Sequence, residues 1–475
     1  MKKDTRRRPS SRVSPARVVA YETLVRVEDE DAYANLILPG AIWRARLDKR
    51  DAAFATELTY GTLRNQGRID WVLSHVVNRP LAQLDTSVRV ILRMTAHQIL
   101  HLRVPDHASV AQSVELAKSV CERGAEKFIN GSGRSLVERG PQYWEEQIHQ
   151  IKRDAERVSV EYSHPQWMVR AFASALAAHG RDPRELPEVL AANNDNPLVS
   201  LCARPGMIMP ADLADDAEYF LKTSARPGDF SEWSVILSGG DPGRLEAVRD
   251  GRAAVQDEGS QLVTTALANV PVDGIDRRWL DVCAGPGGKA GLLGAFAQAR
   301  GAQLLANEIA PHRAELVQNT VAQMPRVTVQ VGDGRELTQR DHFDRILLDA
   351  PCSGLGSLRR RPESRWRRQA RDLPGLVKLQ AELLQSAWRA LAPGGVLAYI
   401  TCSPHEQETV RQIEAVADTK NLQVLPASQL LDEVAMSPIE VQGTPIAEGD
   451  VVQLWPHIHG TDAMFLALLK KTAGE

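Results

Sequence analysis

The fold of this chain is decided by the stretch Arg278-Trp279-Leu280-Asp281-Val282-Cys283-Ala284-Gly285-Pro286-Gly287-Gly288-Lys289-Ala290. Its first five residues have the apolar character of a buried strand, and residues 289–299 have the composition of a helix. A strand, a glycine-rich turn and a helix form the opening unit of a parallel sheet wound with helices. In such sheets ligands bind beyond the carboxyl ends of the strands.

Strands and helices continue to alternate after this stretch, which is typical of a doubly wound α/β sheet. We expect further strands at residues 303–307, 327–331, 345–348 and 396–400. We expect helices at residues 289–299, 311–323 and 377–391. Residues 256–475 are therefore predicted to form one α/β domain.

The glycines of the turn let the backbone approach a ligand closely at a helix N-terminus, and three kinds of ligand compete for it. A Walker phosphate loop needs Gly at Cys283 and Ser or Thr at Ala290, and both are absent. A dinucleotide fingerprint matches loosely, as Gly285-x-Gly287-x-x-Ala290, but that pattern alone is weak.

S-adenosyl-methionine is the third candidate, because carboxylates end the next two strands. Glu308 closes the strand about twenty residues after the glycines, where a carboxylate can hold a ribose diol. Asp333 follows the third strand, which places a second carboxylate near an adenine amino group. Lys289 is expected near the carboxylate of the cofactor.

Two cysteines close two further strands. Cys352 lies in Asp349-Ala350-Pro351-Cys352-Ser353, and Cys402 lies in Thr401-Cys402-Ser403-Pro404. Neighbouring strand ends face one pocket, so the pair points to thiolate chemistry, for which a dehydrogenase has no use. The alternative is two inert core cysteines, and the motif around each thiol argues against it.

Composition and charge set wider bounds. A chain of 475 residues is long enough for two or three domains, and its net charge of −3 gives no global signal for nucleic acid. Five cysteines without a Cys-x-x-Cys pair argue against disulfides or a zinc site, so we expect no metal. No apolar stretch has the length of a membrane span and no secretion signal is visible, so we expect a cytoplasmic protein that contacts no membrane.

The rest of the chain divides into three parts. Residues 1–14 form a basic tail that we expect to be disordered. Residues 15–145 have apolar positions at helical spacing and are predicted to be all-helical. Residues 160–255 mix a helix with short apolar pieces, which indicates a small α+β module.

A dense arginine run follows Cys352. It reads Arg359-Arg360-Arg361-Pro362-Glu363-Ser364-Arg365-Trp366. Arginine matches phosphate oxygens bidentately and tryptophan offers a stacking face, so we predict RNA contacts at Arg359, Arg360, Arg361, Arg365 and Trp366. A solvated loop is the alternative.

Asp281–Lys289, Asp349–Gly354 and Thr401-Cys402-Ser403 resemble the signatures of RNA (cytosine-C5) methyltransferases. Nearly the whole chain resembles the RsmB/Sun type of that family, which methylates bacterial 16S rRNA. The resemblance implies a multidomain fold. It has an N-terminal all-α NusB-like RNA-binding domain, a small α+β (RRM-like) module and a C-terminal Rossmann-like domain that uses S-adenosyl-methionine.

The resemblance also implies roles for single residues. Cys402 would be the nucleophile, Cys352 would help to free the product, and Asp349 would line the boundary between cofactor and base. The implied cofactor site comprises Cys283, Ala284, Gly285, Pro286, Gly287, Gly288, Lys289, Glu308, Arg313, Asp333 and Asp349.

This sequence departs from the family pattern in places, with Gly285 where alanine is usual and Ala290 where threonine is usual. Neither change removes a catalytic group. The expected activity is methylation of cytosine C5 in 16S rRNA by a monomer. The alternatives are the same chemistry on tRNA, or a non-catalytic RNA-binding factor of ribosome assembly.

Overall fold

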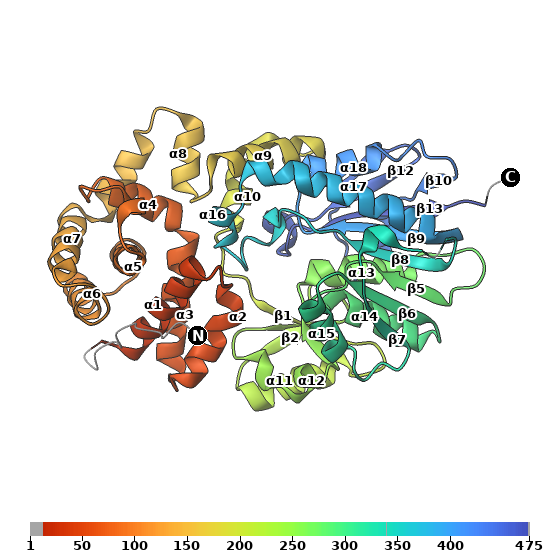
Figure 1. Ribbon diagram of the computed structural model, residues 1–475, viewed down its shortest axis with the longest axis horizontal. Coiled ribbons are helices and arrows are strands. Elements are labelled where there is room, and N and C mark those ends of the chain that lie inside the picture. The colour runs from red at the N-terminus through yellow and green to blue at the C-terminus, as the bar shows by residue number, and fades with distance from the viewer. Residues whose placement is uncertain (1–12, 339, 474–475) are drawn as a thin grey trace. The chain divides into compact units, whose positions relative to one another are not determined.

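The computed structural model describes residues 13–338 and 340–473, and these form two compact units (Figure 1). The helical unit takes in the described residues up to Arg170 together with Leu358–Arg367. The sheet unit takes in Ala171–Ser357 and the described residues from Arg368 onward. The predicted basic tail falls almost wholly on residues 1–12, which lie outside the described residues.

The helical unit confirms the predicted all-α domain. Its first helix begins where Ser14 accepts a hydrogen bond from Arg17 N and Pro15 occupies the first turn, where a missing N–H costs nothing. A core of buried aliphatic residues such as Leu58 and Leu92 joins the helices. These are α1 (Pro15–Asp29), α2 (Ala34–Arg44), α3 (Lys49–Arg64), α4 (Gln66–Ser74), α5 (Thr86–His101), α6 (Asp106–Val120), α7 (Ala125–His149) and α8 (Asp154–Glu161).

A small antiparallel sheet with order β2-β3-β1-β4 forms the predicted α+β module. Leu213 and Ala217 of one helix pack against Leu201 and Val235 of the strands. The elements of this part are α9 (Gln166–Ala178), α10 (Leu186–Ala192), β1 (Val199–Ala203), α11 (Pro210–Leu221), β2 (Ala225–Pro227), β3 (Ser234–Leu237), α12 (Glu246–Arg249) and β4 (Ala253–Val255).

The large sheet has the order β11-β12-β13-β9-β8-β5-β6-β7, with β10 paired to β13. Strands β5 to β9 are parallel and confirm the predicted doubly wound core, while the C-terminal strands add an antiparallel edge. The strands are β5 (Arg278–Asp281), β6 (Gln303–Glu308), β7 (Val327–Val331), β8 (Phe343–Asp349), β9 (Leu391–Thr401), β10 (Leu422–Val424), β11 (Gly443–Ile446), β12 (Gly449–Gln453) and β13 (Phe465–Lys471).

Helices cover both faces of this sheet, because successive strand residues point to opposite sides. Leu347 and Ala398 pack into one core with α13 and α14, whereas Leu348 and Tyr399 pack into another with α17. The helices are α13 (Glu258–Asn269), α14 (Gly288–Ala299), α15 (Pro311–Thr320), α16 (Ser364–Arg367), α17 (Leu373–Ala390), α18 (Val410–Glu414), α19 (Ala427–Val434) and α20 (Pro456–His459). Of these, α16 belongs to the helical unit.

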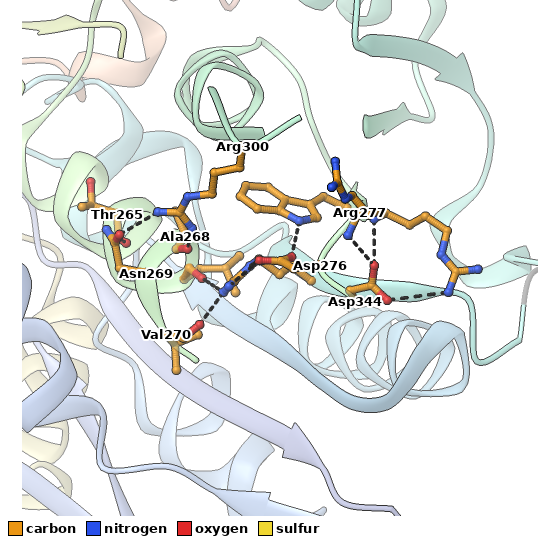
Figure 2. Close-up of polar contacts among 12 residues, drawn as sticks. Thr265, Ala268, Asn269, Val270, Asp276, Arg277, Arg300 and Asp344 are labelled. Carbon is orange, nitrogen blue, oxygen red and sulfur yellow. Dashed lines mark hydrogen bonds and ion pairs between the residues drawn. The ribbon is translucent and has the colours of Figure 1, made fainter. Parts of the chain in front are cut away.

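A polar network ties down the amino ends of β5 and β8 (Figure 2). The buried Arg345 guanidinium donates to both Asp276 oxygens and to the carbonyls of Leu267 and Val270 at the end of α13. Asp344 accepts from the backbone N–H of Arg277 at 2.8 Å. These contacts join the amino ends of β5 and β8 to the end of α13.

Among the described residues, no helix combines the length and the apolar character needed to cross a membrane. The same residues contain no group of three or more His, Cys, Asp or Glu side chains placed to hold a metal ion.

Candidate active site

Two sulfur atoms mark the centre of the site. Cys352 Sγ and Cys402 Sγ lie 3.4 Å apart, and both are half-buried thiols that form no disulfide. Strands β8 and β9 are parallel neighbours with Asp349 opposite Ile400, so the segments that follow leave the sheet side by side. Beyond the strands, Gly356 N donates to the Cys402 carbonyl at 2.9 Å. The structure therefore brings together the two thiols that the sequence placed at neighbouring strand ends.

The Cys352 thiol holds its proton strongly. The hydrogen bond to Cys402 raises the pKa of Cys352 well above its ordinary value, and burial raises it further. A thiol whose pKa is raised keeps its proton near neutral pH. Cys352 is therefore placed to donate its S–H to the sulfur of Cys402.

A half-buried ion pair lies beside the thiols. Lys289 Nζ, in the first turn of α14, donates to Asp349 Oδ2 at 2.8 Å. Burial lowers the pKa of Lys289, but the charge of Asp349 and the hydrogen bond to it outweigh that effect and leave the pKa raised. Cys402 is a further electrostatic partner of this ammonium. Lys289 was expected near the cofactor's carboxylate, and the structure pairs it with Asp349.

The glycine loop runs from the end of β5 to the start of α14. Gly287 has φ +117°, a conformation that L side chains rarely adopt, and a Cβ there would approach Thr320 to 2.9 Å. Ala284 N donates to the Asn307 carbonyl at 2.8 Å, which fixes the loop against β6. Burial raises the pKa of Cys283 well above its ordinary value, so this thiol packs rather than reacts.

The acids at the ends of β6 and β7 are already engaged by protein groups. Glu308 is buried and accepts from Gly285 N and Ala310 N, each at 3.0 Å, while Arg313 pairs with it at 3.6 Å. Gly285, Glu308 and Arg313, which were predicted to share the cofactor site, thus form one cluster. Asp333 is bound by Arg335 at 2.6 Å, and that hydrogen bond lowers the pKa of the carboxyl.

Asp281 is a further candidate site residue, which the sequence reasoning missed although it ends the first strand. It is buried, and its Oδ1 accepts from Cys283 N at 3.2 Å. Its Oδ2 has no hydrogen-bond partner among the described residues. Burial raises the pKa of this carboxyl to about 8, and the charge of Asp349 adds to the effect. An unpartnered buried acceptor beside a glycine loop suits a cationic ligand group.

The arginine run departs from its prediction. It belongs to the helical unit, where Arg365 is fully buried and donates to the carbonyls of Arg64 and Ser163 at 3.0 and 3.2 Å. Arg359 is 5% exposed, and the ring of Trp366 packs against Gly67.

The burial of Arg365 and Arg359 argues against RNA contact at these two residues, because a phosphate needs an accessible guanidinium group. Trp366 is only half-buried, so it remains a candidate for stacking on an RNA base. Arg361 is exposed and Arg360 is half-buried, so both remain candidates.

These features together define a class of protein. A parallel sheet carries a glycine loop after its first strand, acids after the next two and reactive groups after the inner pair. This is the arrangement of a Rossmann-like methyltransferase that uses S-adenosyl-methionine. The cofactor has an aminoacyl ammonium and a sulfonium, and the orphaned Asp281 oxygen fits such a cation.

Comparison with known proteins identifies the family. Residues 268–470 match the family described as 16S rRNA methyltransferase RsmB/F, and residues 14–132 match the NusB family. The protein named "Putative methyltransferase Rv1407" of Mycobacterium tuberculosis is 44% identical over 98% of both chains. Ribosomal RNA small subunit methyltransferase B of Escherichia coli O6:K15:H31 is 30% identical, over 84% of this chain and 89% of its own.

Solved structures show the same fold. The crystal structure of PH0851 matches with a TM-score of 0.80 at 21% identity, covering 98% of this chain and all of that one. NSun6 from Pyrococcus horikoshii, solved with the S-adenosyl-methionine analogue SFG, matches with a TM-score of 0.52 at 16% identity, covering 65% and 99%. The chain belongs to the RsmB/F methyltransferase family, which confirms the resemblance, the fold class and the cofactor expected from the sequence.

Proposed function

We propose that this protein methylates C5 of a cytosine in RNA, with 16S rRNA as the substrate, through a covalent bond between Cys402 and C6 of the base. The sulfur pair at 3.4 Å is the observation that carries the proposal, because a helper thiol in contact with a nucleophilic thiol suits addition followed by elimination. The names of the family and of the Escherichia coli relative support ribosomal RNA as the substrate.

Cytosine C5 needs activation before it can accept a methyl group. The Cys402 thiolate adds to C6, and the ring electrons then make C5 nucleophilic. Bound S-adenosyl-methionine supplies an electrophilic methyl on its sulfonium. Lys289 supports the first step, since its ammonium stabilises a thiolate at Cys402 and also neutralises Asp349. The other carboxylate oxygen of Asp349, Oδ1, can form a hydrogen bond with the polar edge of the base.

Product release reverses the addition. A base removes the C5 proton, the C6–S bond breaks, and its electron pair returns to the sulfur of Cys402. Cys352 retains its proton and lies 3.4 Å from that sulfur, so it donates a hydrogen bond or the proton to the departing thiolate. This assigns acid assistance to Cys352 and bond formation to Cys402.

The substrate has to present both C5 and C6, so the cytosine leaves its base stack. The match of residues 14–132 to the NusB family supports a role of the helical unit in holding RNA. Arg360 and Arg361 are its candidate phosphate contacts.

Tritium release from RNA carrying C5-tritiated cytidine tests the reaction directly. We expect release that requires S-adenosyl-methionine and is abolished in Cys402→Ala. In Cys352→Ala we expect a covalent protein–RNA adduct, seen as a retarded band on a denaturing gel. RNA binding without tritium release would favour the non-catalytic alternative, and release from tRNA rather than 16S rRNA would favour the other substrate.

A further inference from the structure

Glu408 is a fully buried carboxylate that lies six residues after Cys402, in the 3-10 turn Glu406–Glu408. Its Oε1 accepts from Ser353 N at 2.8 Å and from Gln380 Nε2 at 3.1 Å. Its Oε2 accepts from Ser353 Oγ at 2.5 Å and from Ser403 Oγ at 2.7 Å. The ion pairs found among the described residues do not include Glu408, so its charge is balanced by these hydrogen bonds.

The donors are the immediate neighbours of the two thiols. Ser353 follows Cys352 and Ser403 follows Cys402, and their hydroxyl oxygens lie 3.1 Å apart across the carboxylate. Gln380, from α17, also donates to the carbonyl of Pro351, the residue before Cys352, at 2.8 Å. The Glu408 side chain therefore connects to both cysteine segments.

The backbone of Glu408 is held as well. The Tyr399 hydroxyl donates to the Glu408 carbonyl at 2.9 Å, and both groups are buried. Tyr399 lies on β9, three residues before Cys402. The backbone of Glu408 is thus held by the strand that leads into Cys402, which limits how far Glu408 can move relative to Cys402.

A carboxylate suits this place because it only accepts hydrogen bonds and has room for four of them. Burying a charge without a cation is costly, so the arrangement persists only where several charge-assisted bonds offset that cost. The two bonds from Ser353 fail if the Cys352 segment moves away, and the bond from Ser403 fails if the Cys402 segment moves away. The strength of the network therefore depends on the spacing of the segments that carry the sulfurs.

We propose that Glu408 is a positioning residue that sets the distance between the Cys402 and Cys352 sulfurs by clamping Ser353 and Ser403. It does not touch the substrate and acts through the two cysteines. The proposal rests on the proposed function in assigning catalysis to these thiols, but the spacing itself can be measured without any turnover.

A trivalent arsenical such as phenylarsine oxide measures that spacing. Two thiols replace its oxide oxygen, each giving up a proton, so that two As–S bonds form and water leaves. Tight binding needs both sulfurs on one arsenic, and Cys352→Ser supplies the baseline without the pair. Cys121, Cys202 and Cys283 are present in every variant and contribute equally.

Glu408→Ala should weaken arsenical binding at least about tenfold and lower kcat about 10²-fold, with KM for cofactor and RNA unchanged, because reacting groups misplaced by about 1 Å lose that much. Glu408→Gln should keep most of the arsenical affinity and most of kcat. Its amide oxygen accepts from Ser353 N and Gln380, and the two hydroxyls can turn to accept from its N–H groups. Glu414→Gln, an exposed carboxylate in the next helix, is the matched control.

Arsenical binding by Glu408→Ala that equals that of the native protein would overturn the proposal. If Glu408→Ala does not fold, Ser403→Ala removes a single donor and should show a smaller loss in the same two measurements. An arsenical effect without any tritium release in the native protein would uphold the clamp and reject the proposed reaction. The two failures are therefore distinguishable.

Discussion

Lys289 Nζ lies 2.8 Å from Asp349 Oδ2, which joins the first turn of α14 to the end of β8. The pair connects the glycine loop, where the cofactor is expected, to the segment that carries Cys352. It also places a largely shielded cation within electrostatic range of the proposed nucleophile. One side chain can therefore neutralise Asp349 and stabilise a thiolate, two functions that a surface lysine at a helix start would not have.

Lys289→Met should slow methyl transfer and shift thiol reactivity to higher pH. Without the ammonium, a thiolate at Cys402 loses its cation and Asp349 is left as a half-buried unpaired charge. We expect the rate of alkylation of Cys402 by iodoacetamide to rise at a higher pH than in the native protein, measured by peptide mass spectrometry. Lys289→Arg keeps the positive charge and should retain more of the native profile. Identical profiles for native and Met proteins would contradict this role.

Gly356→Ala should disturb the sulfur pair without touching either cysteine. A Cβ at this position would overlap the carbonyl oxygen of Ala463 and come 2.9 Å from that of Cys402. Both obstacles are backbone atoms, so the turn that carries Cys352 must shift. We expect a loss of about 1–3 kcal/mol in urea unfolding and about 10²-fold slower single-turnover methylation.

Gly375→Ala is the matched control for that change, since a Cβ there meets nothing within 4 Å. Its activity should equal that of the native protein. Equal activity of the Gly356 variant would show that the turn tolerates displacement.

The sequence predicted the sheet core and the place of the thiols because both follow from local rules. Strand patterning is local, and parallel strands bring their carboxyl ends to one edge. Glu408 could not be found in this way, since its donors come from Ser353, Gln380 and Ser403, which are separated by up to 50 residues. A glutamate in a polar turn gives no sign that Ser353 and Gln380, which are 55 and 28 residues away, will donate hydrogen bonds to it.

Arg365 shows that a composition argument can also suggest a contact that burial disfavours. In sequence it belongs to a basic run, and a basic run predicts polyanion contact. In the structure it is buried against carbonyls of Arg64 and Ser163, which lie about 300 and 200 residues earlier in the chain. Composition records how many charges a segment has, but tertiary packing decides which of them reach solvent.

Arg365→Met and Arg361→Ala should therefore have opposite effects. The first leaves two buried carbonyl groups without their donor and should cost about 2–3 kcal/mol in unfolding free energy. The second removes an exposed guanidinium that lies over the Tyr33 ring, with a stability change within about 0.5 kcal/mol. If Arg361 contacts phosphate, its variant should reduce the slope of log affinity for RNA against log salt by about 0.7–0.9. A reduced slope for Arg365→Met with unchanged stability would reverse this assignment.

Asp281 should make both stability and cofactor binding depend on pH. Its carboxyl has a pKa raised to about 8 in the folded protein, against 3.8 ordinarily. Between those values the folded state holds a proton that the unfolded state has released, so stability falls by about 1.4 kcal/mol per pH unit as pH rises. Asp281→Asn removes this dependence, and its stability relative to the native protein should increase from pH 5 to pH 8 in urea unfolding. The cationic cofactor should expel the same proton, so its affinity for the native protein should rise with pH over this range, as titration calorimetry would measure. Parallel curves of unfolding free energy against pH for the native and Asp281→Asn proteins would show that Asp281 does not titrate in the site.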